Sequence, residues 1–193
     1  HSCGDFYGAE GGWHASVGSV VETSFKQRDS RGLFTGLTYG NAFTPTTAGV
    51  GGGASAYSSG GNGGGILHIK ALRVHNDGRI SSNGVSCSTP TDNTISAGGG
   101  GAGGSVWMQL QNSLTGTGKI AADGGDACYR GGAGSGGRIS IYAKRDSASD
   151  VFSGNITTKP GLNHANVTTY RQAGGGTIYY GNNDGTGGVL TYS

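Results

Sequence analysis

Runs of glycine, each followed directly by an alternating apolar segment, recur along most of this chain. The apolar segments begin at residues 66, 105, 138 and 177, so successive starts lie 39, 33 and 39 residues apart. A second pattern, Gly-x-Ile followed by small residues and a turn, occupies 78–84, 118–124 and, more loosely, 154–161. Two short strands in each repeat of this length are typical of a solenoid, whose units bury their apolar faces only by stacking.

Alternation along these segments separates two faces. The inward face carries the following residues: Leu67, Ile69, Ala71; Val106, Met108, Leu110; Ile139, Ile141, Ala143; Ile178 and Tyr180. Ile80, Ile120 and Ile156 of the second pattern are expected to point inward as well. Because the same phase holds in every repeat, we expect these residues to form one continuous core.

These patterns predict an all-β fold, namely a right-handed parallel β-helix or related β-solenoid with glycine-rich inserts. The alternative is a bundle of polyglycine helices with short strands. Residues 1–60 are expected to form an N-terminal segment that caps the repeats or adds a partial coil. Residues 61–193 carry the repeats, and the whole is expected to be one continuous domain or a fragment of a longer chain.

Glycine accounts for 43 of the 193 residues. Each glycine in a strand costs about 0.5–1 kcal/mol relative to alanine, so the runs must provide something that other residues cannot. Close approach of one backbone to another is the leading explanation. The alternative, a flexible linker, fits less well because the runs recur at the same phase of each repeat.

Charge and apolar content argue against two kinds of partner, nucleic acid and a membrane-spanning contact with lipid. The formal net charge is +2 and only 12% of residues are charged, so nucleic acid is not expected as a partner. No apolar run reaches the roughly 18 residues that a membrane-spanning helix needs, so no membrane span is expected.

The glycine and strand signatures together resemble a known module. They include Gly8 to His14, Gly63 to Ile69, the 78–84 and 118–124 patterns, and Gly136 to Tyr142. In this order they resemble the glycine-rich repeat module of very large secreted or cell-surface proteins, over about residues 8–181. The resemblance implies extracellular, structural or adhesive roles, and it implies no catalytic residue. The three cysteines, the segment Val17–Leu33 and the loose third pattern depart from that module.

Cysteines and glycosylation motifs also suggest an extracellular or cell-surface location. Cys87 and Cys128 follow Ile80 and Ile120 at nearly equal distances, so stacking would bring them within the reach of a disulfide. The alternative is two unpaired thiols in loops. Cys3 is left over, and we expect its partner in another chain or in sequence beyond this one. Asn155 and Asn166 begin N-glycosylation motifs, available only in a eukaryotic source.

Catalytic, metal and cofactor chemistry is not indicated by the sequence. The outward strand positions carry no Asp or Glu, whereas glycoside hydrolysis requires two carboxylates about 5–9.5 Å apart. Asp123 and Asp126 stand close together, but in a turn, where aspartate is common. We expect no enzyme, no metal site and no cofactor.

The outward strand positions offer a candidate interaction surface. His68, Trp107, Ser140 and Tyr179, here called the outward ladder, occupy matching positions, and Tyr142 flanks them. Exposed aromatic rings can stack on sugars or pack against another protomer, but the chain itself could also cover them. We therefore expect a non-enzymatic extracellular module that assembles with itself or with neighbouring modules into a fibre, sheath or surface layer. A glycan-binding adhesion domain is the first alternative, and a carbohydrate-active enzyme is the second.

Overall fold

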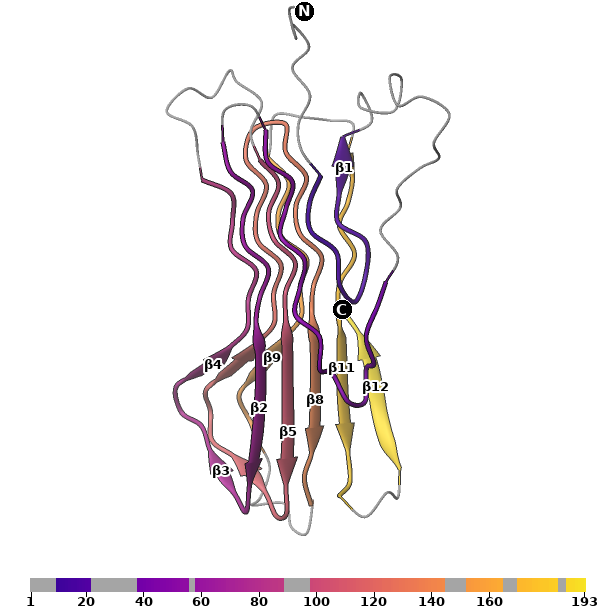
Figure 1. Ribbon diagram of the computed structural model, residues 1–193. Helices are drawn as coiled ribbons and strands as arrows, with labels where there is room; N and C mark the ends of the chain where they lie inside the picture. The colour runs from indigo at the N-terminus through magenta and orange to yellow at the C-terminus, as the bar shows by residue number, and fades with distance from the viewer. Residues whose placement is uncertain are drawn as a thin grey trace, which may run out of the picture.

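The computed structural model describes residues 10–21, 38–55, 58–88, 98–144, 152–164, 170–183 and 187–193. These residues form strands and no helix, which confirms the all-β prediction. No membrane-crossing helix therefore occurs in the described part of the chain. In Figure 1 most strands occupy the lower half, extended glycine-rich segments run side by side above them, and β1 (Val20–Val21) lies beside those segments.

The predicted repeats pair as parallel strands in register. A five-stranded sheet has the order β12-β11-β8-β5-β2, made of Gly188–Tyr192, Thr177–Gly181, Arg138–Tyr142, Ser105–Leu110 and Ile66–Ala71. A three-stranded sheet has the order β4-β7-β9, made of Arg79–Ser81, Lys119–Ala121 and Asn155–Thr157. Every pairing within these sheets is parallel except that of β11 with β12.

Two further pairings complete the described strands. β3 (Val74–His75) lies parallel to β6 (Leu114–Thr115). β1 (Val20–Val21) lies antiparallel to β10 (Tyr170–Arg171). The antiparallel strand β12, which closes one edge of the large sheet, was not predicted from the sequence.

The core joins the inward residues of both sheets. Val106, Met108 and Leu110 of β5 are fully buried, as are Ile139 and Ile141 of β8. All the residues expected on the inward face belong to this one cluster or pack against it, including Ile80, Ile120 and Ile156. The predicted strand phase is therefore confirmed.

The glycine-rich segments above the sheets form what we call the glycine layer. It comprises segments 10–12, 49–53, 60–65, 82–87, 98–104, 122–126 and 131–137. Segments 10–12 and 49–53, from the first 60 residues, therefore contribute to this layer and are hydrogen-bonded to the repeats.

Segment 98–104 lies at the centre of the layer and is buried throughout. From Gly99 to Gly104, successive amides donate to three different segments, and the same order of segments then repeats. The N···O distances are 2.7–3.0 Å. The amides of Gly99 and Ala102 bond segment 49–53, those of Gly100 and Gly103 bond segment 131–137, and those of Gly101 and Gly104 bond segment 82–87. Because every third amide bonds the same neighbouring segment, the backbone has about three residues per turn, as in an extended helix of the polyproline II type.

The carbonyls of the same segment face three other neighbours. Those of Gly99 and Ala102 accept from segment 60–65, that of Gly100 accepts from Gly12, and that of Gly101 accepts from Gly125. Segment 98–104 thus has six hydrogen-bonded neighbours, and none of its residues faces open space.

Steric contact explains why these residues are glycine. A Cβ added at Gly99, Gly100 or Gly101 would lie 2.0–2.1 Å from a carbonyl oxygen of a neighbouring segment. Any side chain would therefore force two backbones apart and break their hydrogen bonds. The glycine runs are packed structure and not linkers.

Equivalent glycines in successive repeats provide a direct test. A Cβ at Gly104 would lie 2.0 Å from the Gly65 carbonyl oxygen, whereas a Cβ at Gly65 would meet nothing within 4 Å. We expect Gly104→Ala to lower the free energy of unfolding by at least about 3 kcal/mol. Gly65→Ala should leave it unchanged or raise it by up to about 1 kcal/mol. Equal effects of the two substitutions in denaturant unfolding would contradict the packing described here.

Candidate functional site

The outward ladder is built by the register of the large sheet. His68 pairs with Trp107, Trp107 with Ser140, and Ser140 with Tyr179 on four adjacent strands. The repeat spacing therefore brought together the ladder residues that it was expected to align. Tyr142 lies two positions beyond Ser140 on β8, and its ring centroid is 5.4 Å from that of Tyr179.

The exposed end of the ladder is a stacked pair of rings. The imidazole of His68 lies parallel to the indole of Trp107, with centroids 4.1 Å apart and an interplanar angle of 3°. His68 Nε2 is 2.9 Å from Gln109 Oε1, which holds the imidazole in place. His68 is exposed and Trp107 is half-buried, so one aromatic pair remains within reach of a ligand.

The other end of the ladder is covered by the chain itself. Residues 39–47, here called the strap, lie against β5, β8 and β11. Ser140 Oγ donates to the Phe43 carbonyl at 2.7 Å, and the Phe43 ring meets that of Tyr179 edge-on at 4.8 Å. Ser105 Oγ donates to the Thr47 carbonyl at 2.6 Å.

We expected that the chain itself could cover the outward ladder, either with its glycine runs or with the segment Val17–Leu33. Of that segment, residues 22–33 lie outside the described part, and the strap provides the contacts that the structure describes. Its apolar content is too small for sequence reasoning to single out.

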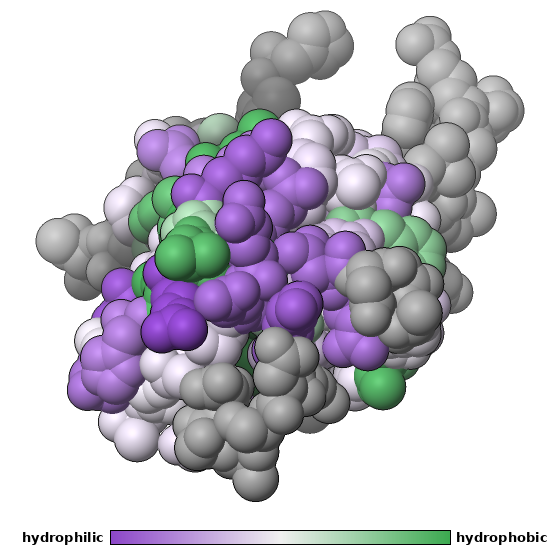
Figure 2. Space-filling view, turned by 90° about the horizontal axis from the view of Figure 1, so that it is seen from below, coloured by the Kyte–Doolittle hydropathy of each residue, from purple (hydrophilic) through white to green (hydrophobic). Residues whose placement is uncertain are grey.

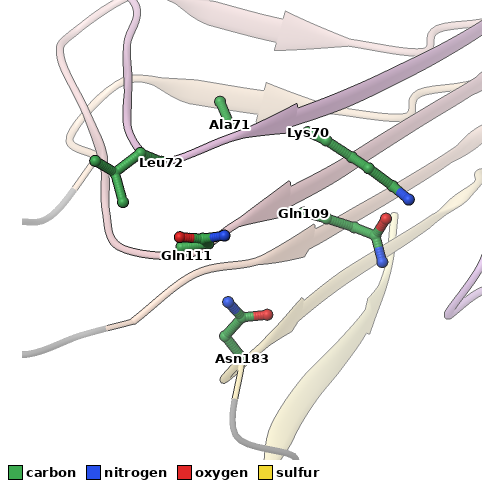
Figure 3. A pocket seen from close by; sticks show the side chains of 6 residues that line it. All are labelled: Lys70, Ala71, Leu72, Gln109, Gln111 and Asn183. Atoms are coloured by element: carbon green, nitrogen blue, oxygen red, sulfur yellow. The ribbon is translucent and has the colours of Figure 1, made fainter.

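A shallow pocket lies beyond the stacked pair, at the carboxyl end of the strands. It encloses about 430 Å³ and is lined by Lys70, Ala71, Leu72, Gln109, Gln111 and Asn183 (Figure 3). Asn183, which follows β11, donates to the Leu110 carbonyl at 2.7 Å and so joins the two strands at the pocket floor. The molecule seen from this end presents a mostly hydrophilic surface with isolated hydrophobic residues (Figure 2).

The strap is anchored by Arg138, which is almost fully buried. Its Nη2 donates to the Tyr39 carbonyl at 2.8 Å and its Nη1 donates to Thr177 Oγ1 at 3.4 Å. Burial lowers the pKa of Arg138 from its ordinary value. The guanidinium serves to bind the strap to β8 and β11.

A buried histidine links the strap to the glycine layer. His14 Nδ1 donates to the Gly103 carbonyl at 2.8 Å, so Nε2 accepts from the Thr47 hydroxyl at 2.9 Å. Burial, assisted by the charge of Arg138, lowers the pKa of His14 to about 4. The imidazole is therefore neutral in the native protein near pH 7.

Two aspartates considered as possible acids bind backbone amides instead. Asp123 Oδ1 accepts from the Lys159 amide at 2.9 Å, while its own amide donates to Asn83 Oδ1 at 3.0 Å. Its second oxygen is 3.0 Å from Thr157 Oγ1 and 3.2 Å from Lys119 Nζ. Asp123 therefore connects three successive repeats.

The same arrangement recurs three residues later. The Asp126 amide donates to Ser86 Oγ at 2.9 Å, and Asp126 Oδ1 accepts from the Leu162 amide at 2.8 Å. Asp77 likewise accepts from the Thr117 amide at 2.9 Å, and that hydrogen bond, followed by one with His75, lowers the pKa of its exposed carboxyl. These hydrogen bonds between repeats were not identified from the sequence, which assigned Asp123 and Asp126 to a turn.

The cysteines and glycosylation motifs are placed as follows. Cys87 and Cys128 form a disulfide with Cα atoms 5.9 Å apart, as their matching positions predict. Asn155 is exposed at the start of β9. Cys3 and Asn166 lie outside the described residues. Within the described part of the chain, no three His, Cys, Asp or Glu side chains are grouped as metal ligands would be.

Comparison with known proteins found no matching family model, no similar curated protein and no similar solved structure. The resemblance to the glycine-rich repeat module therefore stays a prediction.

His14 predicts a specific loss of stability in acid. The unfolded chain binds a proton near the ordinary histidine pKa of 6.5, whereas the native state does so only near 4. Stability due to the neutral imidazole is complete above pH 6.5 and falls as the pH drops toward 4, by up to about 3 kcal/mol. Denaturant unfolding at several pH values should show this slope, and His14→Gln should reduce it. An NMR titration of the His14 ring with a pKa near 6.5 would refute the assignment.

Proposed function

We propose that this chain is a non-enzymatic, extracellular structural module that assembles into a fibre, sheath or surface layer. Its repeats form a right-handed β-solenoid at the strand end, and a bundle of polyglycine helices continues the same repeats at the other end. The two fold predictions, first set against each other, thus become two halves of one molecule.

The observation that carries this proposal is that the backbone of segment 98–104 is hydrogen-bonded to neighbours on all sides of its axis. A backbone with six bonded neighbours resists deformation in every direction across its axis, and it offers no side chains for chemistry. The disulfide between Cys87 and Cys128 links equivalent positions of successive repeats. Because disulfides persist mainly in oxidising compartments, this pair favours an extracellular location.

The placement of reactive side chains also supports a structural role. Asp77, Asp123 and Asp126 hold backbone amides of the next repeat, and His14 and Arg138 bind the strap. These five side chains are thus used in the architecture.

A glycan-binding adhesion function is the second candidate, favoured by the stacked pair at the open end of the ladder. His68 is stacked face to face on Trp107, so the outer face of the exposed imidazole is the flat aromatic surface, and Lys70 and Gln109 line the shallow pocket nearby. Sugars are commonly bound by such a combination of ring faces and hydrogen-bonding groups. Among the described residues, the strap covers the other end of the ladder, where the Phe43 ring contacts that of Tyr179.

Electron microscopy of the native material under non-reducing conditions tests the structural proposal. We expect regular filaments or sheets whose repeat matches the dimensions of this module. A monodisperse, soluble monomer in the native source would contradict assembly.

A glycan array tests the second candidate. Binding by the wild type that is lost in Trp107→Ala, but retained in Phe43→Ala, would establish glycan recognition at the stacked pair. If adhesion is not its role, the wild type should bind no glycan above background. Unfolding curves of both variants serve as the control for structure, because Trp107 is half-buried.

A further inference from the structure

One edge of the stacked repeats has no neighbour among the described residues. β2 is the last strand of the large sheet, and β3 and β4 end their own sheets on the same side. Leu67, Ile69 and Ala71 on β2 are only half-buried, whereas their partners Val106, Met108 and Leu110 on β5 are fully buried. The first repeat therefore exposes apolar side chains whose equivalents in the second repeat are fully buried.

Glycine placement at this edge gives an independent indication. At Gly104, Gly137 and Gly176 an added Cβ would lie 2.0–2.1 Å from the equivalent carbonyl oxygen of the preceding repeat. Gly65 occupies the same position in the first repeat, yet an added Cβ there meets nothing within 4 Å. Its φ is not in the left-handed region, so the backbone does not require glycine either.

The second sheet repeats this observation. A Cβ at Gly118 would lie 2.3 Å from the Gly78 carbonyl oxygen, and one at Gly154 would lie 2.0 Å from that of Gly118. At Gly78 the nearest atom is a side-chain oxygen of Asn76, at 3.9 Å. Gly65 and Gly78 thus have the room that an approaching backbone would need, on both sheets of the same edge.

Backbone hydrogen-bonding groups are available there as well. The Gly65 and Ala71 carbonyls accept from the repeat that contains β5. Since alternate residues of a strand point to opposite sides, the amides and carbonyls of Ile66, His68 and Lys70 face the free side. An extended backbone could therefore pair with β2 through these groups.

We propose that this edge binds a second copy of the chain, whose outermost strand pairs with β2. The occupant must bring an extended backbone and apolar side chains to β2, and the outermost strand β12 of a second copy has both, since Val189 and Tyr192 are exposed. The inference rests on the proposed assembly and specifies its contact surface.

Charge decides which end of the second copy docks. Residues 66–81 carry Lys70, Arg73 and Arg79 but one carboxylate, Asp77, so two such edges would repel each other. At the opposite end of the large sheet the outermost strand is β12, which lies two strands beyond β8 and contains no charged residue. β12 also exposes Val189 by 63% and Tyr192 by 73%, which complements exposed Ile66 and Leu72. The copies are therefore joined head to tail, an arrangement that extends into filaments or closes into rings.

The double variant Gly65→Ala/Gly78→Ala tests this contact, because the methyl group at Gly65 meets no atom within 4 Å and that at Gly78 makes only an ordinary contact with Asn76 Oδ1, at 3.9 Å. Sedimentation velocity over a wide range of protein concentration should show association of the wild type. The double variant should associate about 10- to 100-fold more weakly, with an unchanged thermal midpoint. Thr46→Ala, an exposed position on the strap, is the matched control and should behave as the wild type.

Two outcomes would overturn different statements. Association of the double variant equal to that of the wild type would refute the edge contact and leave the proposed assembly standing. A wild type that remains monomeric at every concentration would refute the proposed assembly itself. Amide exchange adds a second measurement: protection at Ile66, His68 and Lys70 should rise as the wild type is concentrated, and an absence of that rise in associated protein would exclude the edge.

Discussion

Hydrogen bonding between glycine backbones is the interaction on which the rest of this structure depends. The amides of segment 98–104 bond three neighbouring segments, and its carbonyls bond three others. Such packing requires that no residue carry a side chain where two backbones meet, because a Cβ would come within about 2 Å of a carbonyl oxygen. The conformational cost of glycine is offset here by burial of a fully bonded backbone.

The sheets and the glycine layer hold each other in register. The four parallel strands β2, β5, β8 and β11 each continue from a glycine run. A shift of one run by a residue would therefore also shift its strand and turn apolar side chains outward. Asp123 and Asp126 bind amides of the next repeat, and the Cys87–Cys128 disulfide fixes the same level covalently. His14 and Arg138 then attach the strap to this frame.

The strand positions and their faces could be predicted because alternation of apolar residues is a local signal that repeats four times. The pairing of Cys87 with Cys128 was predicted for the same reason, since equivalent positions in stacked repeats must be neighbours. Contacts that depend on distant segments could not be predicted. The strap lies on the sheet through Ser105, Ser140 and Arg138, and none of these residues indicates its partner from the sequence.

The glycine runs could be predicted in part. Their composition indicated close packing, but the choice of six neighbours for segment 98–104 is a property of the folded chain and has no local signature. Amide hydrogen exchange across residues 98–104 tests this central claim most directly. The account predicts that these glycine amides exchange as slowly as those of β5, the strand that follows them. Exchange at the rate of an unstructured glycine peptide would contradict it.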